Sequence, residues 1–447
     1  MLCEMKTLFL LVGFTAGLSA GGWQAGAVAV DVTPREPIWL AGYAARTRPS
    51  ESVRMPIHAK ALALRDDSGT VSVVVTVDLV GIRREMIEPI AERAGRELHI
   101  AREHILFNAS HTHSAPMAGD PTVYEPYMGT YLEAQKAAIG RYTEALPNLI
   151  YSAIAKAAAG LRPATLWFEQ GFAGFAVNRR RVGRRELPGP VDHDVPVLAV
   201  KAEDGRYLAI VFGYACHNTV MDDYTVHGDY AGYAQHMLEE RFPSAAALFV
   251  QGGGADANPL PRRRVEDMER YGAILADAVE DTVEAKMKPV TGPIHAAVET
   301  TEVLFEGPFD RARWQAEAAS PTKPVALHGH RMLAVLDRGG SVPQSRPYMV
   351  QAWRFESGLT LLALAGELTV DYALRFKAQY GPDTTWIAGY SNDVFGYIPS
   401  LRVWKEGGYE GGESFRFSTF PGRFTPDIED RVTSAVERAM AKVRSRQ

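Results

Sequence analysis

The chain has 447 residues, a length that fits one large α/β domain or two smaller ones. Hydrophobic residues make up 46% of the chain and charged residues 23%, as in an ordinary globular protein with a large core. The formal net charge is -5, so the composition argues against nucleic acid or an anionic membrane as a partner.

The N-terminus has the pattern of a cleaved secretory signal. Lys6 precedes an apolar run that is too short to span a bilayer comfortably and that ends in small residues at Ala20. We therefore expect residues 1–20 to be a signal peptide, residues 21–447 to be the mature chain, and the protein to be exported. The alternative is a buried N-terminal helix. Removal of Cys3 leaves only Cys216, so no internal disulfide is expected.

The first half of the chain alternates strands with helices. In chain order, we predict a strand at 26–34, a strand at 71–78, a helix at 83–98, a strand at 104–107, a helix at 130–159 interrupted at Pro147, and strands at 164–168, 195–200 and 208–214.

The second half continues the alternation. We predict a helix at 230–241, a strand at 245–251, a helix at 265–286, strands at 294–303, 332–336, 349–355 and 359–365, a helix at 370–379, a strand at 385–388, and a C-terminal helix with Thr425 as N-cap and Pro426 at its first position. No Pro/Gly/Ser-rich linker divides these elements. The sequence therefore predicts one large α/β domain of mixed β-sheets layered with helices.

A polar loop after the predicted strand at 104–107 carries two histidines one residue apart. In extended backbone, residues i and i+2 point the same way, so His111 and His113 are expected to face one cavity. Neutral imidazole is the commonest protein metal ligand, so one ring can bind a metal while the other serves the substrate. The alternative is a polar loop with two solvated histidines.

Other predicted strands also end in side chains that can bind a metal. His217 ends the strand at 208–214, and Glu367 follows the apolar strand at 359–365, where a buried carboxylate needs a counter-ion or a metal. For Glu367 the alternative is a salt bridge with an arginine. Two histidines and a glutamate fit a catalytic zinc site, and zinc favours hydrolysis of an amide or ester because it acidifies water and polarises a carbonyl.

These stretches together resemble the neutral (non-lysosomal) ceramidase family, over about residues 26–412. Ser-His-Thr-His-Ser-Ala-Pro at 110–116 is similar to the family's Thr-His-Thr-His-Ser-Gly-Pro, and Ala-Gly-Glu ending at Glu367 is similar to its Pro-Gly-Glu. The resemblance implies a catalytic domain that binds one zinc ion through four side chains: His111, His217, Glu367 and Tyr397.

The resemblance also implies roles for further residues. His113 would hydrogen-bond the scissile group or the developing oxyanion, and Arg179, in Val-Asn-Arg, would orient or stabilise the substrate. Tyr397 counts among the catalytic residues as well as among the metal ligands. For Arg179 the alternative is a solvated position in the basic run 179–181. Tyr409, in Tyr-Glu-Gly, is similar to a family tyrosine near the site.

Two departures from the family pattern concern the reaction and the substrate. The family serine of Gly-Asp-Val-Ser-Pro-Asn is replaced by Asn258, which excludes a serine acyl-enzyme at that position and favours direct attack by water. The preceding glycine run, residues 252–254, is expected to form a tight turn, with Asp256 as a group that supports the site. The family's C-terminal immunoglobulin-like domain does not follow the last predicted helix.

The leading hypothesis is therefore a zinc amidohydrolase that converts ceramide or a ceramide-like lipid to fatty acid and amine. Alternatives are the same site acting on another N-acylated amine, an amino sugar or an ester, a non-catalytic secreted zinc protein, and a redox enzyme using iron. His328-Gly-His330 also has the spacing of a ligand pair, but without a partner we expect surface histidines.

Overall fold

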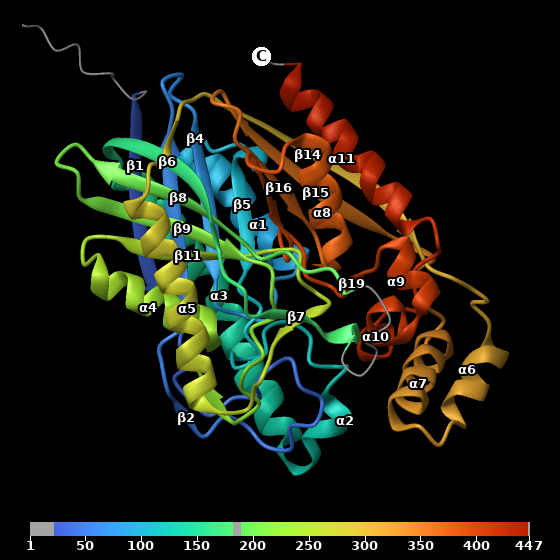
Figure 1. The fold of residues 1–447 in the computed structure, drawn as a ribbon. Helices are drawn as coiled ribbons and strands as arrows, with labels where there is room; N and C mark the ends of the chain where they lie inside the picture. Colours follow the sequence, from blue (N-terminus) through green and yellow to red (C-terminus); the bar gives the residue numbers. More distant parts are fainter. Residues whose placement is uncertain (1–21, 182–188, 446–447) are drawn as a thin grey trace, which may run out of the picture.

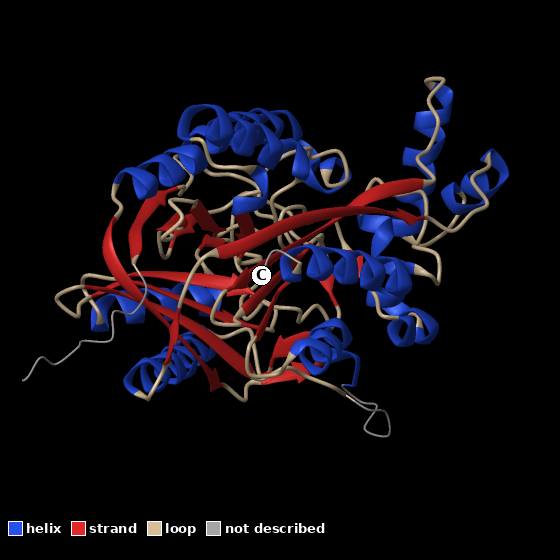
Figure 2. Cartoon of the chain, turned by 90° about the horizontal axis from the view of Figure 1, so that it is seen from above, coloured by secondary structure: helices blue, strands red, loops and turns tan. Residues whose placement is uncertain are grey.

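Two β-sheets pack face to face in the centre of the molecule, and helices cover their outer faces (Figures 1 and 2). The computed structural model describes residues 22–181 and 189–445, so the expected signal at 1–20 lies outside the described residues.

The larger sheet runs, in spatial order, through β11 (Ala246–Gln251), β9 (Tyr207–Tyr214), β8 (Asp194–Ala202), β6 (Arg162–Phe172), β1 (Trp23–Asp31), β3 (His58–Arg65), β4 (Val71–Val77) and β5 (Ile105–Ala109), and β13 (Lys288–Val290) pairs with β6. The smaller sheet runs through β14 (Ile294–Leu304), β15 (Ser345–Phe355), β16 (Thr360–Leu364) and β18 (Thr385–Ala388). Both sheets are mixed: β4 with β5, β9 with β11 and β16 with β18 are parallel, and the other neighbours are antiparallel.

Three short strand pairs lie outside the two large sheets. They are β2 (Ser52–Val53) with β10 (Thr225–Val226), β7 (Ala176–Asn178) with β12 (Ala257–Pro259), and β17 (Glu367–Leu368) with β19 (Tyr397–Ile398). The last two pairs matter for the site, because they align segments that are distant in the sequence.

Alternating apolar residues explain the layers. In β9, Ile210 and Phe212 face the helices, whereas Val211 faces the other sheet and packs in a core that also contains Trp353 and Trp386. Helices α1 (Arg84–Leu98), α3 (Leu132–Ala159), α4 (Asp229–Arg241) and α5 (Val265–Glu284) cover the larger sheet, and α8 (Val370–Tyr380) and α11 (Ile428–Arg444) cover the smaller one. The predicted fold class, a single large domain of mixed sheets with helices, is confirmed.

The remaining helical segments are short or peripheral. They are η1 (Arg102–His104), α2 (Glu125–Met128), η2 (Gly129–Tyr131), η3 (Arg179–Arg181), α6 (Arg311–Ala318), α7 (Lys323–Asp337), α9 (Leu401–Glu406), α10 (Gly408–Gly411) and η4 (Glu413–Phe417). Helices α6 and α7 form a hairpin at the edge of the molecule, at the lower right of Figure 1.

Three predictions of local structure are wrong. The apolar run 332–336 is not a strand but the end of α7, since five apolar residues fit either element and the helix begins earlier, at Lys323. Helix α3 is continuous through Pro147. The C-terminal helix begins at Ile428 with Asp427 at its N-cap, and Thr425 instead donates to the Asp427 carboxylate over 2.5 Å.

His328 is fully buried, so the expectation of a surface histidine is wrong at this position. Its Nε2 donates to the carbonyl of Phe420 over 2.7 Å, and its Nδ1 lies 2.5 Å from a carboxylate oxygen of Glu317. His328 therefore joins the α6–α7 hairpin to a segment that lines the large cavity described below.

Replacing His328 by alanine is expected to lower the free energy of unfolding by about 2–4 kcal/mol, because a buried carbonyl and a largely buried carboxylate lose their partner. Urea unfolding measures the change. Replacement of the exposed neighbour His330 is the control and is expected to cost less than about 0.5 kcal/mol. An equal effect of the two substitutions would contradict this role of His328.

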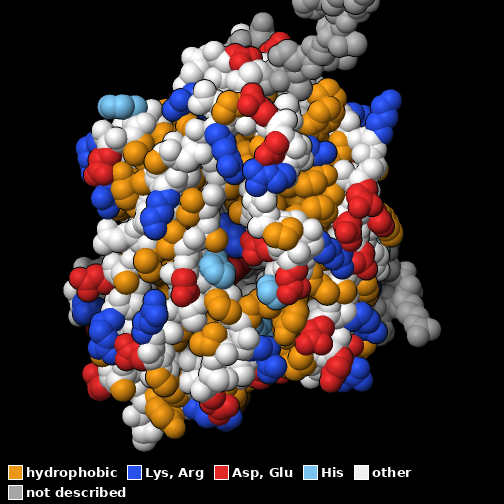
Figure 3. Space-filling view, turned by 90° about the vertical axis from the view of Figure 1, so that its left-hand side faces the viewer, with side chains coloured by type: hydrophobic (Ala, Val, Ile, Leu, Met, Phe, Trp, Pro, Cys, Tyr) orange, Lys and Arg blue, Asp and Glu red, His pale blue; other side chains and the backbone are white. Residues whose placement is uncertain are grey.

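Acidic and basic side chains are intermixed with hydrophobic ones on the face shown in Figure 3, which carries no patch of a single charge sign. In the two described ranges, no helix combines the length and the apolar character that crossing a bilayer requires.

Candidate functional site

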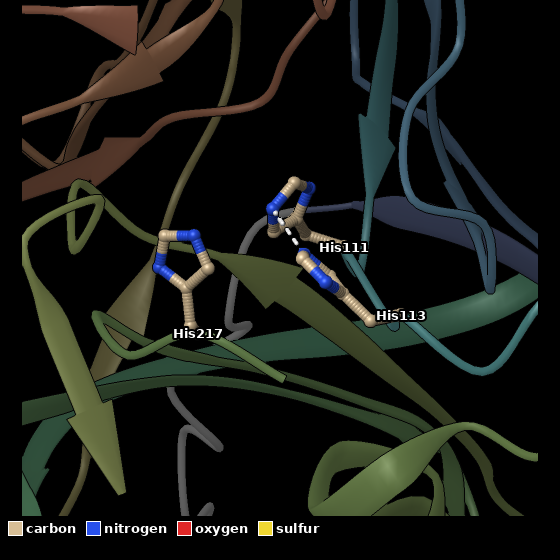
Figure 4. Close-up of side chains that lie close together, drawn as sticks. All are labelled: His111, His113 and His217. Atoms are coloured by element: carbon tan, nitrogen blue, oxygen red, sulfur yellow. Dashed lines mark hydrogen bonds between the residues drawn. The ribbon is translucent and has the colours of Figure 1, made fainter. Parts of the chain in front are cut away.

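The loop after β5 brings two imidazoles together. His111 has a left-handed backbone with φ of 61°, so the expectation that extended backbone would align the two histidines is wrong. Their rings nevertheless line the same cavity, and His111 Nε2 lies 3.1 Å from His113 Nε2 (Figure 4). His111 Nδ1 lies 2.5 Å from the carbonyl oxygen of Val80. Because a carbonyl only accepts, Nδ1 carries the proton, and the unprotonated Nε2 can accept from His113 or bind a metal.

His217 follows β9 and is fully buried beside the glycine run 252–254. Its Nδ1 donates to the carbonyl of Gly254 over 3.2 Å, which again leaves Nε2 unprotonated and able to accept a hydrogen bond or bind a metal. The glycine run packs tightly against the chain before His217, because a Cβ on Gly254 would lie 2.1 Å from the carbonyl oxygen of Ala215. Close packing of backbone on backbone therefore fixes the position of His217.

Glu367 brings a carboxylate to these two imidazoles from β17, the short strand that follows β16 of the smaller sheet. Its Oε2 lies 3.4 Å from Nε2 of both His111 and His217. This buried oxygen has no hydrogen-bond partner among the described residues.

Burial keeps all three histidines neutral. It lowers the pKa of His111 to about 4, against the opposing effect of Glu367, and it lowers the pKa values of His113 and His217 well below their usual range. Two lone pairs and a carboxylate oxygen thus converge, and a bound cation would relieve their repulsion. This donor set of nitrogen and oxygen atoms fits zinc.

Tyr397 completes this cluster through the β17–β19 pair, whose register places it opposite Glu367. Its hydroxyl lies 3.2 Å from His217 Nε2 and accepts a hydrogen bond from Arg179 Nη2 over 2.9 Å. The structure therefore brings together the four side chains expected to bind metal, and Arg179 contacts the last of them directly.

A second combination of ligands is also geometrically available. One ring nitrogen from each of His111, His113 and His217 lies within 4.8 Å of the others, so this buried group can hold a metal ion as well. His113 is therefore placed either to bind the metal or to act beside it. Its Nδ1 is buried without a partner among the described residues.

The three residues expected to support the site lie in different surroundings. Asn258 is buried and lies 3.4 Å from Arg179 Nη1 through its Oδ1. The ring of Tyr409 packs 5.3 Å from that of Tyr397 and lines the cavity. The Asp256 carboxylate accepts from the backbone N–H of Val370 at the start of α8 and from the side chain of Asn178.

Glu410 is a site residue that the sequence did not single out. It is buried in α10 and accepts hydrogen bonds over 2.6 Å from both Arg179 and Arg180. Burial raises the pKa of Glu410, but the charge of Arg179 and the hydrogen bonds to the carboxylate together outweigh burial, and the pKa lies below its usual value. The three consecutive arginines at 179–181 could have indicated this residue, because guanidinium groups that become buried need an acidic partner.

A cavity of about 690 Å³ opens from this cluster and is lined in part by His111, His113, Glu367 and Tyr397. Its walls are rich in apolar and aromatic side chains, among them Met86, Met117, Tyr124, Phe395, Phe415 and Phe417. The site thus combines a polar cluster with a cavity whose lining includes many apolar and aromatic side chains beside polar ones.

Comparison with known proteins gives a consistent result. Residues 23–259, more than half of the chain, match the sequence profile of a family described as "Neutral/alkaline non-lysosomal ceramidase, N-terminal". No sequence among curated proteins matches the chain.

Two of the solved structures that share the fold are ceramidases. One is a neutral ceramidase from Pseudomonas aeruginosa, with a TM-score of 0.73 at 17% identity, covering 95% of this chain and 75% of the other. The second is a ceramidase complexed with C2, with a TM-score of 0.72 at 18% identity, covering 94% and 76%. At these identities the likeness concerns the fold.

Proposed function

Because the chain belongs to the neutral/alkaline non-lysosomal ceramidase family, we propose that it is a zinc-dependent hydrolase that cleaves the N-acyl amide bond of ceramide or a ceramide-like lipid. Water is consumed, the C–N bond breaks, and a fatty acid and an amine are released. The observation that carries the proposal is the convergence of Glu367 Oε2 with the two unprotonated Nε2 atoms of His111 and His217. In this proposal residues 21–447 form the exported mature chain.

His111, His217, Glu367 and Tyr397 would hold one zinc ion. Zinc bound there would polarise the amide carbonyl and lower the pKa of water. His113 lines the cavity beside these residues, where its ring can hydrogen-bond the scissile group or the developing oxyanion. Arg179 would add positive charge next to Tyr397, where negative charge increases during attack on the carbonyl.

Asn258 would act by positioning rather than by nucleophilic attack, because a carboxamide cannot form the acyl-enzyme that a serine can. Its side chain instead contacts the guanidinium of Arg179. This arrangement supports direct attack by water as the route of hydrolysis.

The lining of the cavity supports a lipid substrate. A long acyl chain can bury its methylene groups against apolar side chains of the cavity such as Met86, Phe395 and Phe417. We therefore favour a substrate with a long acyl chain, as in ceramide-like lipids, and keep other N-acylated amines, amino sugars and esters as alternatives.

The test is release of fatty acid from a long-chain N-acyl-sphingosine by purified mature protein, with and without a chelator, and with metal content measured on the same sample. We expect release that the chelator abolishes and that zinc restores. Protein that carries one zinc ion without releasing fatty acid would contradict the lipid substrate and redirect the search to other acylated amines. Absence of both zinc and release would refute the proposed function.

A further inference from the structure

Glu410 makes two short contacts in the buried wall of the site. One carboxylate oxygen accepts from Arg179 Nε and the other accepts from Arg180 Nη1, both over 2.6 Å. Only 5% of the residue is exposed, so these charge-assisted bonds are shielded from solvent. A carboxylate in this position is a strong anchor for a neighbouring guanidinium.

Each nitrogen of the Arg179 guanidinium contacts a different residue. Nε donates to Glu410, Nη1 lies 3.4 Å from Asn258 Oδ1, and Nη2 donates to Tyr397 over 2.9 Å. Because the guanidinium is planar and its N–H bonds have a fixed geometry, anchoring Nε restricts the direction in which Nη2 points. The short bond to Glu410 therefore fixes the donor that reaches Tyr397.

The hydroxyl of Tyr397 lies between two functional groups. On one side it accepts from Arg179 Nη2, and on the other it lies 3.2 Å from His217 Nε2. Glu410 makes no hydrogen bond with Tyr397 or His217 in the described part of the chain, so the hydrogen-bonded link from Glu410 to Tyr397 runs through Arg179.

We infer that Glu410 is a positioning residue for the proposed hydrolase: it holds Arg179 so that Nη2 faces the Tyr397 hydroxyl. Loss of this anchor frees the guanidinium to rotate, and Tyr397 then loses a fixed hydrogen-bond donor. The inference rests on the proposed function for its effect on turnover, but the geometry it describes also predicts an effect on metal affinity.

The competing role is a purely structural one, in which Glu410 only attaches α10 to the basic run 179–181. Glu406 provides a matched control because it belongs to the same ionic network. It accepts from Arg180 over 3.2 Å and from Arg181 over 2.9 Å, and within the described ranges it makes no hydrogen bond with Arg179.

The experiment compares Glu410→Gln with Glu406→Gln. We expect Glu410→Gln to lower kcat about 10- to 100-fold, with KM changed less than about threefold, and to weaken zinc binding about tenfold in a chelator competition assay. We expect Glu406→Gln to stay within about twofold of the wild type in both measurements. Equal effects of the two substitutions, or an unchanged Glu410→Gln protein, would overturn the inference.

A double-mutant cycle separates positioning from structure. In an Arg179→Ala background, Glu410→Gln is expected to lower kcat and zinc affinity by less than about a further twofold, because the guanidinium that Glu410 positions is already absent. A further loss as large as the one that Glu410→Gln causes in the wild type would overturn the inference.

If Glu410→Gln fails to fold, Arg180→Ala replaces it in the comparison: this variant keeps the Glu410–Arg179 pair and is expected to bind zinc like the wild type. Tenfold weaker binding by a folded Arg180→Ala protein would contradict a specific role for that pair.

The zinc assay distinguishes this inference from the proposed function. If the wild type binds zinc but does not hydrolyse the lipid, the proposed substrate fails, whereas the difference in zinc affinity between Glu410→Gln and Glu406→Gln still tests the positioning. If that difference is absent in a protein that hydrolyses ceramide, only the positioning role fails.

Discussion

Replacing His217 by alanine is expected to remove most bound zinc and to lower kcat/KM for N-acyl-sphingosine about a thousandfold or more. A thousandfold loss corresponds to about 4 kcal/mol of transition-state stabilisation. The expectation follows from the position of His217, whose unprotonated Nε2 lies near Glu367 Oε2 and the Tyr397 hydroxyl. Metal content and initial rates on the same purified protein measure the effect. His236→Ala is the control, since the His236 side chain is 58% exposed on α4.

Two companion substitutions distinguish the possible ligand sets. Glu367→Gln keeps the size of the side chain but removes its charge, and it is expected to weaken zinc binding strongly. His113→Ala is expected to retain zinc and to lose turnover if His113 acts beside the metal. Loss of zinc in His113→Ala would instead favour the group of three histidines. Full activity and retained metal in His217→Ala would refute the proposed ligand assignment.

The second large effect is expected from Gly254→Ala. The added methyl group would lie 2.1 Å from the carbonyl oxygen and 2.2 Å from the carbonyl carbon of Ala215, so the backbone must move. Overpacking of this kind costs about 1–3 kcal/mol, or more where backbone atoms are involved. The movement is transmitted to His217 because the Gly254 carbonyl accepts from its ring. We therefore expect both a lower free energy of unfolding and weaker zinc binding.

The adjacent glycine is a stringent control for this prediction. A Cβ on Gly253 would lie 3.5 Å from the nearest atom, the Cβ of Ala373, which is an ordinary van der Waals distance. Gly253→Ala is therefore expected to fold and to bind zinc like the wild type. Urea unfolding and chelator competition compare the two variants, and equal behaviour would contradict the importance of the close approach at Gly254.

The architecture could be predicted from sequence where strands are apolar and continuous. The run 208–214 and the run 359–365 each contain enough buried residues to define a strand, and each is followed by a polar residue that lies at the site. The prediction of a strand at 332–336 was wrong because helix α7 contains the same apolar residue types. The choice between strand and helix depends there on packing against α6.

The site could be predicted only in part, because side-chain contacts between distant segments leave little trace in local sequence. His111 and His113 were singled out from an extended strand, whereas His111 has a left-handed backbone. No role was predicted for Glu410, because an acidic residue in a Gly-rich segment is common in surface loops. Its role becomes visible only in the structure, where Arg179 Nε lies 2.6 Å from its carboxylate. Likewise His328 was expected at the surface because no partner could be recognised in the sequence; its partner Glu317 belongs to a different helix.

Segments that follow each of the two sheets contribute to the site, and this has a consequence for how the protein folds. His111 and His217 follow strands of the larger sheet, whereas Glu367 and Tyr397 belong to segments that follow β16 and β18 of the smaller one. Docking of such distant segments is a slow event with a high entropic cost. A cation held by all four residues would cross-link the sheets and add about 4 kcal/mol of stability at a free metal concentration a thousand times the Kd. Tight metal uptake during refolding should therefore coincide with the last step, the closure of one sheet upon the other.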